Sequence, residues 1–185
     1  KCAFCGAKIS PLSPLCELMC GILFVFAWQF SANTFEFAFL SLYLATLLLL
    51  SLIDIKCKAV PEILLWINFI FALCVAYDEK EFLFGSFLID ALIFAGGIFL
   101  LKSFVSCILN IRRQHEKLES MGEADILLIA GMGAILGLKF GFYALFATSL
   151  LVLPCFFFVK KNTPIPLIPF LSLAFVGVFS VKDGL

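Results

Sequence analysis

Two aspartates stand where apolar runs of the chain end or begin. Asp54 follows the apolar run 37–53, and Asp125 opens the run 125–138. Charged side chains at the edge of a bilayer are costly, so they are candidates for a functional site. Two carboxylates brought together in a partly desolvated place repel each other, so one stays ionised while the other keeps its proton. The ionised one can take a proton from water and the other can donate to a substrate carbonyl, which is the chemistry of an aspartic protease.

Each acid also has an ordinary structural interpretation. Acids at helix ends are often simply solvated, and Asp125 lies where the N-terminus of a helix favours an anion. Asp90 lies inside the apolar run 82–109 and is interpreted as a hydrogen-bonding or lumen-facing residue. A proton relay through Asp90 is disfavoured, because the sequence shows no second intramembrane acid, no inverted repeat and no pair of broken helices.

The elements that must position these acids are transmembrane helices. The 185 residues are 63% hydrophobic and 14% charged, with a mean hydropathy of +1.14, whereas soluble domains are about half apolar and a quarter charged. The net charge is zero and gives no indication of a nucleic-acid partner. Because about 20 residues cross the hydrocarbon, the apolar runs predict an all-α, polytopic membrane protein with seven spans. These are 15–30, 37–53, 61–77, 82–109, 125–138, 140–159 and 164–181.

The basic residues predict how these spans are oriented. Lys and Arg accumulate on the cytoplasmic side of a membrane. With the N-terminus inside, ten of the 13 basic residues fall in inner segments and three in outer ones. This topology places both Asp54 and Asp125 at the cytoplasmic surface and the C-terminus outside.

Small residues at regular spacing predict a close helix contact. Gly133, Gly137 and Gly141 recur every four residues, and Ala130 and Ala134 share that spacing. Such spacing lets helix backbones approach closely in lipid. The face is either a general packing surface or the surface that holds Asp125 beside Asp54.

Three segments together resemble a known family. The segment MGEADILLIAGMGAILG (121–137) is similar to the GxGD segment of the type IV prepilin peptidases, which are membrane aspartic proteases. Gly122 and Asp125 match that motif, Ala124 replaces its second Gly, and Leu127 stands where a Lys is common. The segment LIDIKCKAVPE (52–62) resembles the first catalytic segment, and PIPLIPFLSLAF (164–175) resembles the Pro-rich start of the last span. The resemblance implies that Asp54 and Asp125 are catalytic, with Gly122 and Pro61 as supporting motif residues, whereas Glu62 departs from the pattern.

The N-terminal segment resembles half of the family's cytoplasmic zinc module. Cys2 and Cys5 have the spacing of two ligands of a tetrahedral zinc site. The resemblance implies a second pair upstream, so the chain, which begins with Lys, is interpreted as a fragment or a processed form. Cys16 and Cys20 are an alternative second pair but are more typical of apolar positions. Residues 1–14 are therefore assigned to a cytoplasmic half-module and 15–185 to a transmembrane peptidase domain.

The resemblance implies a function and a location. The expected activity is removal of the leader peptide from type IV prepilins or pseudopilins, with the active site facing the cytoplasm from the bacterial inner membrane. The family resemblance also implies structural zinc and, in many members, N-methylation of the new N-terminus with S-adenosylmethionine. Three alternatives stay open: a preflagellin-type peptidase without methylation, a transporter and a non-catalytic assembly protein.

Overall fold

The computed structural model describes residues 12–57, 59–79, 85–112, 123–158 and 166–183. They form helices α1 (Leu12–Phe30), α2 (Thr34–Cys57), α3 (Glu62–Glu79), α4 (Ser86–Arg112), α5 (Glu123–Phe158) and α6 (Ile168–Asp183). No strand occurs in these ranges, so the predicted all-α class is confirmed. By length and composition, α1, α2, α4 and α5 can each cross a membrane, while α3 and α6 are shorter apolar helices.

Helix starts follow from local chemistry. Glu36, in the first turn of α2, accepts the backbone N–H of Ala32 through its Oε2 at 2.7 Å, as the acidic residue of a capping box reaches back to an N–H before the helix. At the start of α3, the carbonyl of Pro61 accepts the N–H groups of Leu64 and Leu65 at 3.1 and 3.4 Å. Proline suits a helix start, because it has no N–H to satisfy. Pro61 therefore fixes the point at which the chain re-enters a helix after α2.

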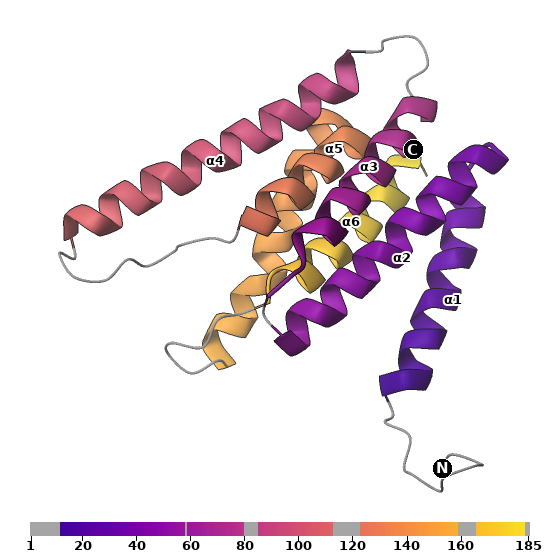
Figure 1. The fold of residues 1–185 in the computed structure, drawn as a ribbon, viewed down its shortest axis with the longest axis horizontal. Helices are drawn as coiled ribbons and strands as arrows, with labels where there is room; N and C mark the ends of the chain where they lie inside the picture. Colours follow the sequence, from indigo (N-terminus) through magenta and orange to yellow (C-terminus); the bar gives the residue numbers. More distant parts are fainter. Residues whose placement is uncertain (1–11, 58, 80–84, 113–122, 159–165, 184–185) are drawn as a thin grey trace, which may run out of the picture.

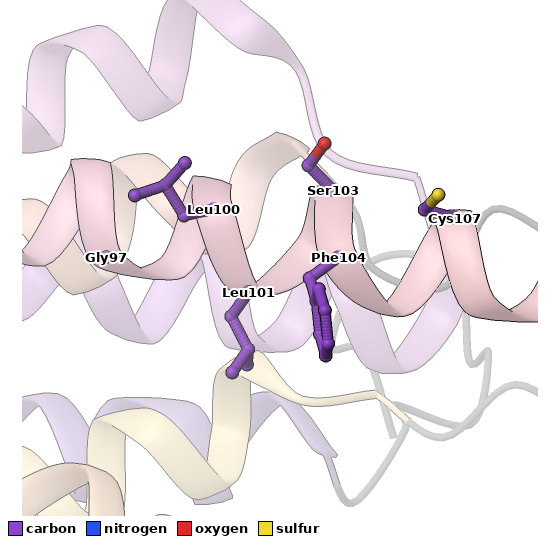
Figure 2. Close-up of a pocket in the computed structure, with 6 residues that line it drawn as sticks. All are labelled: Gly97, Leu100, Leu101, Ser103, Phe104 and Cys107. Carbon is purple, nitrogen blue, oxygen red and sulfur yellow. The ribbon is translucent and has the colours of Figure 1, made fainter.

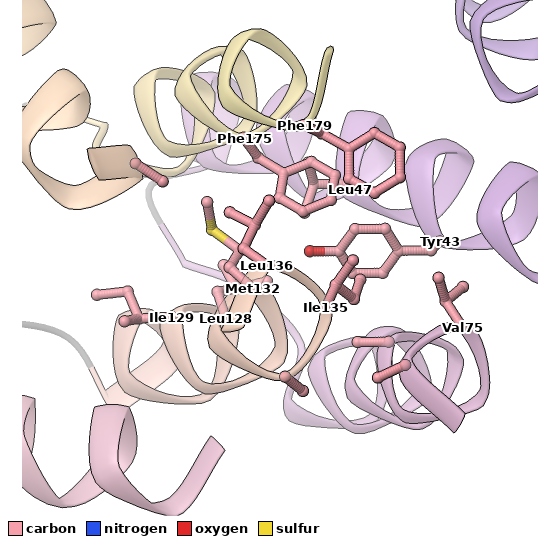
Figure 3. Packing of buried hydrophobic residues seen from close by; sticks show 14 of the residues in the cluster. Tyr43, Leu47, Val75, Leu128, Ile129, Met132, Ile135, Leu136, Phe175 and Phe179 are labelled. Atoms are coloured by element: carbon pink, nitrogen blue, oxygen red, sulfur yellow. The ribbon is translucent and has the colours of Figure 1, made fainter. Parts of the chain in front are cut away.

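Four helices surround the core. Both α3 and α6 pack against α2 and against α5, while α1 lies outside on α2 and α4 lies outside on α5. The core is filled by the Tyr43 ring from α2, Ile135 from α5 and the Phe175 and Phe179 rings from α6 (Figure 3). The Tyr43 and Phe175 ring centroids are 5.2 Å apart in an edge-on contact. Thus α2 and α5 are held in place mainly through the two helices between them.

Helix α5 reverses direction in its middle. Gly137 has φ 74° and ψ 176°, a conformation that glycine adopts without penalty and other residues avoid. A Cβ added at Gly133 or at Gly141 would overlap the same Phe94 ring of α4. In a straight helix these two residues would be about 12 Å apart, at 1.5 Å per residue, so one ring touches both only because the chain folds back. The segments expected at 125–138 and 140–159 therefore share α5, and the chain reverses at Gly137, near the end of the first segment.

Polar contacts inside the bundle tie neighbouring helices together. Asn68 of α3 is buried, and its Nδ2 donates to the Tyr43 carbonyl at 3.2 Å and to Thr46 Oγ1 at 2.7 Å on α2. Lys182 Nζ of α6 donates to the Ile135 carbonyl at 3.0 Å. That carbonyl lies in the last turn before Gly137, where a helix end leaves carbonyls without internal partners. Lys182 thus caps the C-terminal end of the first half of α5.

Candidate active site

Asp54 connects the end of α2 to the start of α6. Its side chain is half-buried in the last turn of α2, and its Oδ2 accepts the backbone N–H of Ile168 at 3.3 Å, across 114 residues of sequence. Ile168 is the first residue of α6, and the first N–H groups of a helix lack partners within it. One turn deeper, Ser51 Oγ donates to Ser172 Oγ at 3.3 Å. The carboxylate is therefore fixed on one oxygen, in a small polar contact between two helices.

Asp125 lies in the first turn of α5 and is half-buried. Its neighbours Ala124 and Ile126 line a cavity together with Glu62, the first residue of α3. Glu62 is close in sequence to Cys57, where α2 ends. The starts of α3, α5 and α6 and the end of α2 therefore lie at the same end of the bundle. Asp54 and Asp125, 71 residues apart in sequence, share that end.

The cavity beside Asp125 has a volume of about 380 Å³. It is bounded by three helices: Glu62, Leu65 and Trp66 come from α3, Phe99 and Lys102 from α4, and Ala124, Ile126 and Leu127 from α5. Its size falls within the range of about 300–1,000 Å³ that is usual for small-ligand sites. The lining is largely apolar, with one carboxylate and one ammonium.

A larger hollow of about 660 Å³ lies elsewhere, along α4. Figure 2 shows that the six residues that line it, from Gly97 to Cys107, all come from this one helix. They include no carboxylate and no ammonium, and Leu100 and Phe104 among them are exposed. An exposed apolar face of this kind suits contact with lipid chains, since the residues of a membrane-spanning helix are predominantly apolar. The size of this hollow therefore gives no reason to place chemistry there.

Comparison with known proteins identifies the family. A family model described as the type IV leader peptidase family matches residues 41–158, more than half of the chain. The chain belongs to the type IV leader peptidase family. A prepilin leader peptidase/N-methyltransferase of Vibrio cholerae serotype O1 is 29% identical over 184 residues, which is 97% of this chain and 70% of that relative. A protein of the same name from Neisseria gonorrhoeae is also 29% identical, over 100% of this chain and 63% of its own length. No solved structure matches the chain.

The part matched by the leader peptidase family includes both aspartates and Pro61. Among the other residues singled out in the sequence, Gly122, Cys2 and Cys5 lie outside the described residues. Within the ranges that are described, no group of three or more His, Cys, Asp or Glu side chains could hold a metal ion. Asp90 lies half-buried in α4.

The small residues of α5 make their close contact with a different helix from the one that carries Asp54. Gly133 and Gly141 do provide a close contact, but it is made to Phe94 of α4, whereas Asp54 is on α2. Gly133 and Gly141 therefore bear on the position of Asp125 only through the packing of α5 on α4. Helices α3 and α6 each touch both α2 and α5, so they connect the two helices that carry the aspartates.

Sequence reasoning missed several residues of this end of the bundle. The backbone N–H of Ile168 was not foreseen as a partner of Asp54, because a main-chain donor has no sequence signature. Lys102 is one of the basic residues that predict the orientation of the spans, and Trp66 and Phe99 lie in apolar runs. Lys102 carried a usable signal, since an ammonium at the membrane edge is costly and calls for a partner.

Proposed function

We propose that this protein is an aspartic endopeptidase that removes leader peptides from type IV prepilins or pseudopilins. It acts at the cytoplasmic face of the bacterial inner membrane, with Asp54 and Asp125 as the catalytic pair. The observation that carries the proposal is that two half-buried carboxylates from distant parts of the chain share one end of an apolar bundle. Membership of the leader peptidase family supports the reaction class.

The chemistry follows from two carboxylates in different protonation states. The ionised aspartate accepts a proton from a water molecule, whose oxygen then bonds to the carbonyl carbon of the scissile peptide. The protonated aspartate donates to the carbonyl oxygen and stabilises the tetrahedral intermediate. The C–N bond then breaks, and the leaving nitrogen takes a proton as the new N-terminus. The apolar segment of the substrate stays in lipid while its cleavage point meets the acids.

The test replaces each aspartate by its isosteric amide. Asp54→Asn and Asp125→Asn keep size and hydrogen bonding but remove the titratable group. Each is expected to lower the rate of prepilin cleavage in membranes by about 10²–10⁴-fold, the usual contribution of a general acid or base. Asp90→Asn, in the outer helix α4, is the matched control and should cleave near the parent rate.

A contrary result is easy to recognise. If a folded Asp54→Asn or Asp125→Asn protein cleaves prepilin like the parent, the catalytic pair is wrong. A transporter or an assembly partner, which keeps the helices without needing both acids, would then be the better description.

N-methylation and zinc binding by this chain are also proposals. S-adenosylmethionine would supply an electrophilic methyl group for N-methylation of the new N-terminus, and the names of the two relatives support this second activity. A peptidase without methylation is the alternative.

A structural zinc ion on Cys2 and Cys5 would need two more ligands. Metal analysis of the native protein against a Cys2→Ser/Cys5→Ser variant tests the zinc proposal, and equal zinc content in both would contradict it.

A further inference from the structure

We infer that the 380 Å³ cavity between α3, α4 and α5 is the binding site of the methyl donor, S-adenosylmethionine. Lys102 binds the carboxylate of the donor and Glu62 binds its ammonium. The inference rests on the proposed function, since it assigns a place to the second activity proposed for this chain. It concerns binding by named residues and can be tested without any measurement of turnover.

Three helix faces converge on the cavity. On α3, Glu62, Leu65 and Trp66 are spaced so that they lie on one face, and on α4 Phe99 and Lys102 are one turn apart. The first turn of α5 closes the third side. Helix α4 packs extensively on α5 but only slightly on α3, and Figure 1 shows its second half running away from the bundle. This divergence leaves the space between α3 and α4 open.

Two opposite charges line the cavity, from Glu62 and Lys102. Lys102 is half-buried in a helix whose neighbouring side chains, Leu101 and Phe104, are exposed apolar residues. Among the described residues, neither Lys102 nor Glu62 has an ion-pair partner. Glu62 is exposed at the start of α3, whereas an ammonium that is half-buried beside apolar side chains, such as that of Lys102, is costly unless it is paired. A ligand that carries both signs of charge would satisfy both side chains at once.

The chemistry of the donor matches this lining. Its amino-acid part is a zwitterion, which suits Lys102 and Glu62. Its sulfonium is a cation, and cations are attracted to the faces of aromatic rings. Trp66 and Phe99 present such rings, with 56% and 59% of their surfaces exposed in the isolated chain. Its adenine is a flat base, which stacks well on an aromatic side chain.

The position of the cavity suits methyl transfer. Ala124 and Ile126 line it and flank Asp125, beside which the new N-terminus would form. For the transfer, the ammonium form of the new N-terminus would first lose a proton to water, which frees its lone pair. S-adenosylmethionine would supply the methyl group to this lone pair, and the donor would leave as a neutral thioether. A cavity next to the peptidase carboxylates lets the same amine be made and methylated without leaving the site.

The first experiment measures affinity for S-adenosylhomocysteine, the product that the methyl donor becomes, using the whole chain in lipid nanodiscs and titration calorimetry. Lys102→Met and Glu62→Gln should each weaken binding by about 10- to 100-fold, as expected when a hydrogen-bonded charge loses its partner. Lys139→Met and Glu17→Gln change a lysine and a glutamate that do not line the cavity and should bind like the parent. Cleavage of prepilin is measured in parallel, and the two control variants should keep the parent rate.

A second experiment localises the ligand by fluorescence. The chain has two tryptophans, and only Trp66 lines the cavity. In a Trp28→Phe variant, S-adenosylhomocysteine should change the emission in a saturable way. In a Trp66→Phe variant, which retains Trp28, it should not.

The outcomes separate the two proposals. The inference is overturned if the parent binds no S-adenosylhomocysteine, or if Lys102→Met and Glu62→Gln bind it as tightly as the parent. It is also overturned if these variants keep that affinity but raise the KM for prepilin, because the cavity would then belong to the peptide. If the parent fails to cleave prepilin while ligand binding depends on Lys102 and Glu62, the peptidase proposal fails and the binding site stands.

Discussion

Asp54 has two roles that can be separated experimentally. As a hydrogen-bond acceptor it fixes the first residue of α6, and as a titratable acid it is a proposed member of the catalytic pair. An amide oxygen can still accept the N–H of Ile168, whereas a methyl group cannot. The choice of substitution therefore decides which role is lost.

The resulting prediction compares two variants of this residue. Asp54→Ala should lower the free energy of unfolding by about 1 kcal/mol, the typical cost of losing a side-chain cap, and Asp54→Asn by much less. Both should lose cleavage. Unfolding by SDS titration in mixed micelles gives the stabilities, and equal stability of the two variants would argue against a capping role.

A second prediction concerns the hydrogen bonds of the Asn68 side chain. Its amide joins α3 to α2 through two hydrogen bonds, and such contacts between membrane helices contribute about 0.6 kcal/mol on average and about 1.7 at most. Asn68→Leu should destabilise the protein within that range in the same unfolding assay. Thr46→Val, which removes only one of the two acceptors, should cost less, and a larger loss for Thr46→Val would contradict the assignment.

Among the elements, α5 carries the most unusual geometry. Its two halves meet at Gly137, the Phe94 ring of α4 contacts both halves, and Lys182 of α6 closes the first half. The hairpin is therefore supported from two neighbouring helices. Since Asp125 is in the first turn of this hairpin, the position of its carboxylate depends on how the hairpin packs against α4 and α6.

Adding a methyl group at the contact between Phe94 and the hairpin should show whether this contact stabilises the protein. Gly141→Ala should destabilise the protein by about 1–3 kcal/mol, because the added methyl group meets the Phe94 ring. Combining it with Phe94→Leu should restore part of the loss, so the double variant should be more stable than the sum of the single effects predicts. Gly177→Ala is the control, because nothing lies within 4 Å of a Cβ at that position. Strict additivity of the two changes would show that the ring and the glycine are not in contact.

At the scale of the whole molecule, the helices alternate in direction, so their ends define two faces. Cys57, at the end of α2, is exposed on the face that carries Asp54, and Gly85, just before α4, is exposed on the opposite face. The distribution of basic residues predicts that the first face is cytoplasmic.

Labelling in intact cells tests this orientation. A variant whose only cysteine is Cys57 should react with an impermeant maleimide only after the inner membrane is opened. A variant whose only cysteine is Gly85→Cys should react before that. Labelling of both from the same side would refute the arrangement of the two faces.

Much of the fold could be predicted because hydropathy alone locates the helices, while the orientation taken from the charge bias stays a prediction. The arrangement of the helices could not. In lipid, the faces of a helix that meet other helices and those that meet acyl chains are both apolar, so a pattern such as that of α4 does not reveal its partner. The spacing of Gly133 and Gly141 correctly indicated close packing, yet not that Phe94 was the neighbour or that Gly137 reversed the chain. The partner of Asp54 is a backbone group 114 residues away, which no local pattern encodes.

The contact between Phe94 and the two glycines also limits the order in which these three positions can change during evolution. One aromatic ring occupies the space that side chains at positions 133 and 141 would need. A mutation to a larger residue at either position is therefore harmful while position 94 is aromatic, and tolerable once position 94 has become small. The three sites should accept changes only in a permitted order, the ring first and the glycines afterwards. In relatives that carry Ala or Ser at either glycine position, the residue equivalent to Phe94 is expected to be smaller than phenylalanine.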